Sequence, residues 1–383
     1  MRFADIVGQK QVKEHLIGTV KTGRISHAQL FLGPEGNGGL ALALAYAQLV
    51  TCQNPNENDS CGECSSCRKY SRLIHPDLHF SYPFFAKHKD DTAISFIEEW
   101  REAFLANPYL GLNEWRNSLD AENKQANINI AECHQIIKKL SLKTFESEYK
   151  VLIMWLPEYL DKEGNTLLKL IEEPPAKTLF LLVAQSQDQI LNTILSRTQL
   201  VKINRFGDSE IKSYLVQDKG LDAAKAEQIA YLSEGNLNTA FNLIKGEADL
   251  NFQLFSEWLR MCFANKVPAI IDFVESTAKA GRENQKNFFK FGIKMLREAT
   301  ICMSGVSELI HLPKLEKEFI INVSKAINPA KAEAMFNELE KAHYHIERNA
   351  NAKILFLDLS LQFVKILKFN TLPPVGGTQH IYN

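Results

Sequence analysis

The first 205 residues alternate short apolar runs with stretches of helical periodicity, and this alternation limits the possible folds more than any other feature. The apolar runs are Ala28–Leu32, Leu78–Phe80, Lys150–Trp155, Leu179–Ala184 and Leu200–Ile203. Continuous apolar runs of this length are typical of strands that are covered on both faces. Strands that alternate with helices favour a parallel sheet. We therefore predict an α/β domain over residues 1–205.

The remainder of the chain has a helical pattern without strands. Short helices are expected over Ser209–Val216, Ala223–Ser233 and Leu237–Lys245, and longer ones from Leu250 to Phe369 with a break near Leu312-Pro313. Residues 371–383 are rich in Pro and Gly, which predicts a flexible tail. The predicted division is thus 1–205, 206–248 for a small helical domain, 249–370 for a larger helical domain, and 371–383 for the tail.

The overall charge excludes one class of partner-binding protein. The 44 Lys and Arg residues nearly balance the 45 Asp and Glu residues, which leaves a net charge of -1. A histone-like protein that coats nucleic acid would be strongly basic. No run approaches the ~20 apolar residues of a membrane span, and the first residues lack the apolar core of a secretion signal. We expect a cytoplasmic protein.

A glycine loop follows the first predicted strand and begins a helix, as a phosphate-binding P-loop does. Its glycines are Gly33, Gly36, Gly38 and Gly39. A P-loop has Lys and then Ser or Thr after its last glycine, but Gly39 and Leu40 hold those positions here. The loop therefore lacks the charge that neutralises phosphates and the hydroxyl that binds Mg²⁺. It is either a degenerate P-loop or an ordinary glycine turn.

The strand at Val151–Met154 should be followed by Asp-Glu in a P-loop ATPase. Trp155 and Leu156 stand there instead, and Glu158 lies three residues beyond the Asp position. An aromatic residue at a strand end is expected to belong to the core. With both halves of the Mg²⁺ site absent, we do not expect ATP to be bound productively.

Four of the seven cysteines lie close together, as Cys52, Cys61, Cys64 and Cys67. The two Cys-x2-Cys steps are too short for unstrained disulfides and suit one tetrahedral Zn²⁺ ion. Four thiolates complete the coordination of zinc, so the expected role of this module, residues 51–68, is structural. Unpaired thiols are the alternative, and His75 or His79 is a possible substitute ligand.

Ser196-Arg197-Thr198 lies between a predicted helix and the last strand. Arg197 has three possible roles: to remain solvated, to pair locally, or to contact a phosphate on a neighbouring subunit as an arginine finger.

The order of these motifs resembles the bacterial clamp-loader subunits of the AAA+ class, and among them the delta-prime type of DNA polymerase III. The matching segments are Asp5–Gln9, Ile25–Pro34, the cysteine spacing, Asn165–Pro175, Ile194–Thr198, Glu234–Ala240 and Arg348–Lys353. The resemblance implies a RecA-like AAA+ P-loop domain with a zinc-binding insertion, a small helical lid domain and a C-terminal helical collar domain. It also implies a heteropentamer with gamma/tau and delta subunits that places a sliding clamp on primed DNA.

The departures from the family pattern indicate the kind of subunit. Besides Gly39 and the Trp155-Leu156 pair, Asn238 replaces the sensor-2 arginine, and Ala184-Gln185-Ser186 replaces a typical sensor 1. This pattern resembles a non-hydrolysing delta-prime subunit, in which Arg197 would act in trans as an arginine finger. The alternatives are an active gamma/tau-type ATPase and a zinc-dependent nucleic-acid-binding protein.

The segment from Ser81 to Asn127 is longer than the resemblance leads us to expect. It contains eight aromatic residues: Tyr82, Phe84, Phe85, Phe96, Trp100, Phe104, Tyr109 and Trp115. One interpretation is a partner surface or a platform for stacking DNA bases. The favoured one is an amphipathic helix over Ile94–Leu105 whose Ile97, Trp100 and Phe104 pack on the domain.

Overall fold

The protein is described by a computed structural model in two compact units, Met1–Phe241 and Asn242–Asn383. The described residues are 1–86, 88, 90–121, 124–245, 247–305, 312–348 and 350–368. The predicted tail, 371–383, lies outside them. The boundary between the units falls within helix α11 (Leu237–Ile244), so the separate lid domain at 206–248 stays a prediction.

The first unit contains the parallel sheet that the sequence predicts. Its strands are β1 (Ala28–Leu32), β2 (Leu78–Ser81), β3 (Lys150–Trp155), β4 (Thr178–Ala184) and β5 (Gln199–Lys202). Their order is β2-β3-β4-β1-β5 and every pairing is parallel. The register places Leu30 beside both Leu182 and Leu200. The predicted fold class, a RecA-like α/β domain followed by helices, is confirmed.

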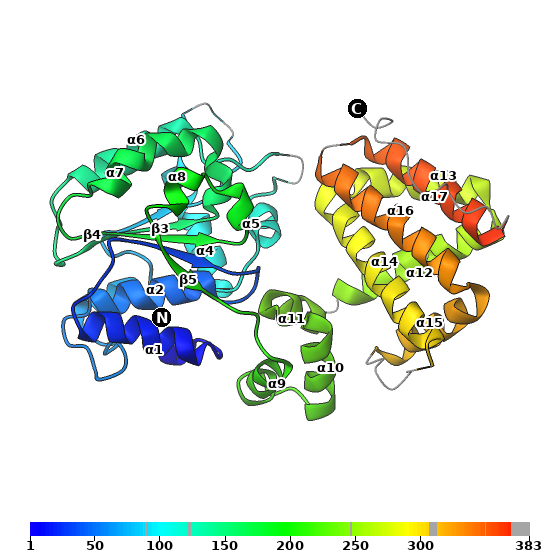
Figure 1. Ribbon diagram of the computed structural model, residues 1–383, viewed down its shortest axis with the longest axis horizontal. Coiled ribbons are helices and arrows are strands. Elements are labelled where there is room, and N and C mark those ends of the chain that lie inside the picture. The colour runs from blue at the N-terminus through cyan, green and yellow to red at the C-terminus, as the bar shows by residue number, and fades with distance from the viewer. Residues whose placement is uncertain are drawn as a thin grey trace. The chain divides into compact units, whose positions relative to one another are not determined.

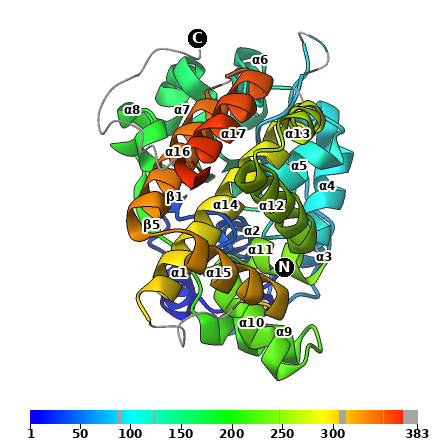
Figure 2. The same cartoon turned by 90° about the vertical axis from the view of Figure 1, so that its right-hand side faces the viewer.

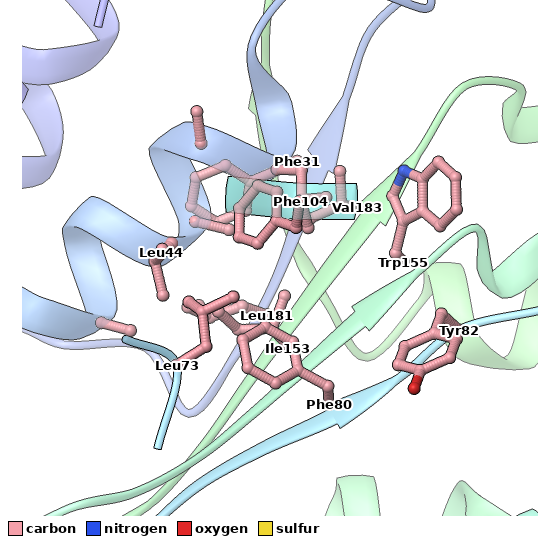
Figure 3. Packing of buried hydrophobic residues seen from close by; sticks show 14 of the residues in the cluster. Phe31, Leu44, Leu73, Phe80, Tyr82, Phe104, Ile153, Trp155, Leu181 and Val183 are labelled. Carbon is pink, nitrogen blue, oxygen red and sulfur yellow. The ribbon is translucent and has the colours of Figure 1, made fainter. Parts of the chain in front are cut away.

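Helices cover both faces of this sheet (Figure 1). One face carries α1 (Lys10–Lys21) and α2 (Gly39–Val50), and the other carries α6 (Ile130–Ser141), α7 (Leu168–Glu172) and α8 (Asn192–Leu195). The strand residues divide between two buried clusters in alternation. Phe31, Ile153 and Leu181 belong to the first, which Figure 3 shows, and Leu30, Leu152 and Leu182 to the second. Because side chains on both faces of the sheet are buried, the strand sequences are apolar without interruption.

The path from β3 to β4 begins with a 3-10 helix, η3 (Pro157–Leu167), and continues in the short α7. Leu156 has a positive φ of 55°, and Pro157 follows it at the first helical position. The chain therefore turns sharply at the end of β3 before it resumes a helical path.

The aromatic-rich segment forms part of the core of the first unit. It contains η2 (Ala93–Phe96), α4 (Ile97–Ala106) and α5 (Leu112–Ser118). All eight of its aromatic residues are buried, with Tyr109 the most exposed at 6%. Trp100 stacks on Tyr82 with ring centroids 4.1 Å apart. The amphipathic-helix interpretation is confirmed, and no aromatic ring of this segment is available to stack a base.

After β5 come the three short helices α9 (Asp208–Gln217), α10 (Ala223–Ser233) and α11 (Leu237–Ile244), which we call the lid helices. Their limits agree with the predicted ones to within one residue. Helices α9 and α10 pack on each other, with Ile211, Leu215, Ala226 and Ile229 buried, and the ring of Tyr214 on α9 lies 6.2 Å from that of Phe241 on α11.

The second unit is helical. Its helices are α12 (Glu247–Ala264), α13 (Val267–Lys279), α14 (Arg282–Met303), α15 (Lys314–Ala326), α16 (Pro329–Glu347) and α17 (Ala352–Lys368). Figure 2 shows α16 and α17 side by side. Trp258 is fully buried, lies 4.6 Å from the ring of Phe363, and donates its indole N–H to Ser360 Oγ at 2.9 Å. Among the helices described, none has the length and apolar character needed to cross a membrane.

Candidate functional site

The glycine loop lies at the carboxyl end of β1, between β4 and β5 in the sheet. In open parallel sheets, ligands bind in the crevice at this edge. Gly36 and Gly38 have φ values of +74° and +83°, which only glycine adopts readily. The loop therefore has the glycine-dependent geometry that a phosphate-binding loop needs.

The amide at the start of α2 is occupied by the chain itself. Gly39 N–H donates to Asn37 Oδ1 at 2.9 Å, and Asn37 Nδ2 donates to the carbonyl of Ile203 at 3.4 Å. In a P-loop, the amides at this helix N-terminus face the phosphates. Here one of those amides already has a side-chain acceptor, and Asn37 is buried.

The residues that replace the Mg²⁺ site are structural. Trp155 is 3% exposed and its ring lies 5.2 Å from that of Trp100, so it is the core aromatic residue that the sequence predicts. Leu156 is buried too. Figure 3 shows Trp155 near Val183, at the ends of β3 and β4.

Glu158 binds the segment that follows β4. Its Oε1 accepts the backbone N–H groups of Gln185 at 2.5 Å and Ser186 at 2.9 Å. Burial raises the pKa of this carboxyl group. Glu158 therefore fixes the segment after β4 to η3, a contact that the sequence did not indicate.

Asn238, at the sensor-2 position, is buried and lies on α11. Its Oδ1 accepts a hydrogen bond from Asn107 Nδ2 at 2.7 Å, and its own Nδ2 donates to Glu35 Oε1 at 3.5 Å. The side chain thus links the lid helices, the glycine loop and the aromatic-rich segment. It brings no positive charge to the crevice.

Arg197 lies in the short connection between the end of α8 and the start of β5. Its side chain is 33% exposed and forms an ion pair with Glu172, the last residue of α7. Nη1 also donates to the carbonyl of Thr193 at 2.8 Å and to Ser196 Oγ at 3.1 Å. The guanidinium group is therefore held in one orientation while remaining partly accessible. Residue spacing alone did not reveal Glu172 as its partner.

The four predicted cysteines are brought together in the structure. Their sulfur atoms all lie within 4.8 Å of one another. The Sγ–Sγ distances are 3.6 Å for Cys52–Cys61, 3.9 Å for Cys61–Cys67 and 3.6 Å for Cys67–Cys52. A tetrahedron with Zn–S bonds of about 2.3 Å has edges of about 3.8 Å, whereas a disulfide needs about 2.05 Å. The cluster fits a metal ion and not a disulfide.

Backbone amides prepare these sulfurs to be ligands. Cys61, Cys64 and Cys67 donate their N–H groups to the sulfurs of Cys52, Cys61 and Cys64 respectively, at 3.3 to 3.4 Å. The amides of Cys64 and Glu63 lower the pKa of Cys61 to about 6, which favours its thiolate, whereas burial raises the pKa of Cys52 and of Cys67. The short helix α3 (Ser65–Tyr70) begins directly after Cys64 and carries Cys67.

The two histidines considered as substitute ligands lie outside the cysteine cluster. His75 is buried, with Nε2 3.1 Å from Glu146 Oε1 and Nδ1 accepting the N–H of Asp77 at 3.1 Å. His79 lies on β2, and burial together with the charges of Lys139 and Lys150 lowers its pKa to about 4. His75 is thus a loop residue and His79 a strand residue, and neither belongs to the group of four sulfurs.

A parallel sheet of this order, with a glycine loop after β1 and lid helices after β5, defines a P-loop protein of the RecA-like class. The family described as DNA polymerase III, delta subunit, matches residues 8–207. The chain belongs to this family.

Individual relatives carry the names of several subunits. The chain is 23% identical over 373 residues to the DNA polymerase III subunit delta' of Escherichia coli (strain K12), covering 94% of this chain and 96% of that one. It is 31% identical over 185 residues to the delta' subunit of Yersinia pestis, and the alignment covers 48% of this chain and 43% of that one. With the gamma subunit of Buchnera aphidicola subsp. Acyrthosiphon pisum it shares 25% identity, covering 65% of this chain but 59% of the relative.

Solved structures with similarity include a DNA polymerase III gamma subunit-related protein of Thermotoga maritima and a clamp loader delta protein of Bacillus subtilis. The first has a TM-score of 0.41 and 15% identity, covering 92% of this chain and 98% of that one. The second has a TM-score of 0.32 and 11% identity, covering 92% and 99%.

Proposed function

We propose that the chain is a non-hydrolysing, delta-prime-like subunit of the DNA polymerase III clamp loader. In this role it assembles with gamma/tau and delta subunits and presents Arg197 to ATP bound by a neighbouring motor subunit. The complex then loads a sliding clamp onto primed DNA. The chain's own residues hold and orient the guanidinium group, and the neighbour supplies nucleotide and Mg²⁺.

The observation that carries this proposal is the contrast between two ends of the same domain. At the glycine loop, Gly39, Trp155 and Asn238 leave no cationic side chain and no metal-binding carboxylate where a motor subunit needs them. At the other end, Arg197 is oriented by Glu172 and Thr193 and remains partly exposed. An arginine finger acts through charge and geometry at the transition state, so it needs no nucleotide in its own chain.

The extent of the matches supports the delta-prime type over the gamma/tau type. The E. coli delta' relative aligns over 96% of its length, whereas the tau subunit of Bacillus subtilis (strain 168) aligns over 37%. The gamma/tau type remains the second candidate because its members align over 63–65% of this chain at similar identity.

Calorimetric titration of the purified chain with Mg·ATP separates the two candidates. The delta-prime proposal predicts no binding at millimolar nucleotide, and a sub-millimolar dissociation constant would favour a motor subunit. Reconstitution with gamma/tau, delta and the sliding clamp from the same host provides the second test. A stable complex is expected, and failure to join one would contradict the proposal.

A zinc-dependent nucleic-acid-binding protein is the third candidate, and it requires binding by the isolated chain. Such binding should weaken steeply with salt because counterions are released from the phosphates. We expect no tight binding of primed DNA by this chain alone, in keeping with its net charge of -1.

A further inference from the structure

The segment Asn107–Gly111, which connects α4 to α5, crosses the crevice above the glycine loop. The crevice is lined by the loop itself, Trp155, Val183–Gln185 and, from this segment, Pro108, Tyr109 and Leu110. The cavity that remains measures about 20 Å³. That volume holds about one water molecule, whereas small-molecule sites measure roughly 300–1,000 Å³.

Tyr109 contacts three parts of the first unit. Its hydroxyl oxygen accepts the N–H of Val7 at 3.2 Å, and a Cβ atom on Gly38 would lie 3.0 Å from its ring. The ring also makes edge-to-face contacts with Phe206 and Phe241, each with centroids 6.1 Å apart. One buried aromatic side chain therefore joins the N-terminal residues, the glycine loop and the lid helices.

Asn107 adds a polar link between the same parts. Its Nδ2 donates to Asn238 Oδ1 on α11 at 2.7 Å, while its Oδ1 accepts the N–H of Tyr109 at 3.0 Å. The segment is thereby hydrogen-bonded to the lid helices and folded back on itself.

The charge in the crevice also opposes a phosphate. Glu35, within the glycine loop, packs against Gly111 so closely that a Cβ atom there would lie 2.5 Å from Glu35 Oε1. An anionic ligand in the crevice would lie close to this carboxylate, and like charges repel each other.

We propose that Asn107–Gly111 is a built-in substitute for a nucleotide: it fills the crevice and fastens the lid helices to the α/β domain. In consequence, the position of the lid helices is independent of ATP. The exchange of the Tyr109 and Asn107 variants can contradict this inference without affecting the proposed role of Arg197, and the reverse also holds; a response of the unmodified chain to Mg·ATP would contradict both the inference and the proposed function.

Contacts that do not involve Asn107–Gly111 make the proposal falsifiable. Leu237 N–H donates to the carbonyl of Gly36 in the glycine loop at 3.2 Å, and Arg205 Nη1, between β5 and α9, donates to the carbonyl of Glu234 at 2.8 Å. If these bonds alone held the lid helices, the removal of Tyr109 would leave them as well protected as before.

Hydrogen–deuterium exchange of the full chain tests the inference. Tyr109→Ala should speed amide exchange in α9–α11 at least tenfold and leave β1, β3 and β4 unchanged. Tyr109→Phe keeps the ring and should have little effect. Leu105→Ala, near the end of α4 and 50% exposed, is the matched control. Millimolar Mg·ATP should not alter lid exchange in the unmodified chain.

Two results would overturn the inference: lid exchange in Tyr109→Ala equal to that in Leu105→Ala, or lid protection that increases when Mg·ATP is added to the unmodified chain. If Tyr109→Ala also loosens the sheet, Asn107→Ala decides instead. Faster lid exchange with a protected sheet supports the fastening role, and unchanged lid exchange excludes it.

Discussion

Arg197 and Glu172 form an ion pair that joins the loop before β5 to the end of α7. The two residues are 25 positions apart in the chain. A single carboxylate oxygen, Glu172 Oε1, contacts both Nε and Nη2 of the guanidinium group, and such charge-assisted contacts help to orient the arginine. Because both side chains are partly exposed, the ion pair contributes little to the stability of the fold, and its main effect is to orient the guanidinium group of Arg197.

The first prediction concerns this orientation. Glu172→Gln should lower ATP hydrolysis by the reconstituted clamp loader several-fold, because Arg197 then samples more rotamers. Assembly should be unaffected. Glu173→Gln, at the adjacent exposed position, serves as the control. Equal turnover for the two variants would show that Glu172 does not position Arg197.

The second prediction concerns the cysteine cluster. Metal analysis of the purified chain should find about one zinc ion per molecule. Cys64→Ser should lose that zinc and destabilise residues 51–68, because a structural zinc site contributes directly to folding. Cys302→Ser, outside the cluster, should keep it. A metal-free preparation that is fully folded would refute the site.

The third prediction concerns pH and His79. Its pKa is about 4 in the folded chain against an ordinary value of 6.5, because burial disfavours the charged ring. The unfolded chain therefore binds a proton below about pH 6.5 and the folded chain only near pH 4. Stability should be constant above this range and fall as the pH drops through it, by up to about 1.4 kcal/mol per pH unit.

Urea unfolding of His79→Gln measures this contribution. The variant should lose part of the decline between pH 6.5 and 4, while His15→Gln, on the exposed face of α1, should keep all of it. Identical pH profiles for the two variants would mean that His79 is not the residue responsible.

The fourth prediction concerns the crevice. Gly39→Lys combined with Leu40→Ser restores the two missing P-loop side chains, yet we expect no Mg·ATP binding by calorimetry. The reason is that Pro108–Leu110 covers the crevice and leaves a cavity of only about 20 Å³. Circular dichroism establishes whether the variant is folded. Sub-millimolar binding by a folded variant would show that nucleotide is excluded by the absence of the P-loop Lys and Ser side chains and not by the segment Pro108–Leu110.

The strands could be predicted from the sequence because burial on both faces leaves an unbroken apolar run, as in Lys150–Trp155. The cysteine cluster could be predicted because its ligands lie close together in the chain. The contacts of Tyr109 could not, since Phe206 and Phe241 are distant in sequence and no local pattern links them. The same holds for the pairing of Arg197 with Glu172, although the resemblance had already drawn attention to both segments.

The most direct test of the central claim is ATP hydrolysis by the reconstituted complex with Arg197→Ala in this chain. The account predicts that hydrolysis of the ATP bound by the adjacent motor subunit falls at least tenfold. Arginine fingers contribute a factor of about 10³ or more to such rates. Assembly should be intact, and Arg24→Ala, at another exposed arginine, should have no effect. Unchanged turnover with Arg197→Ala in a fully assembled complex would contradict the account.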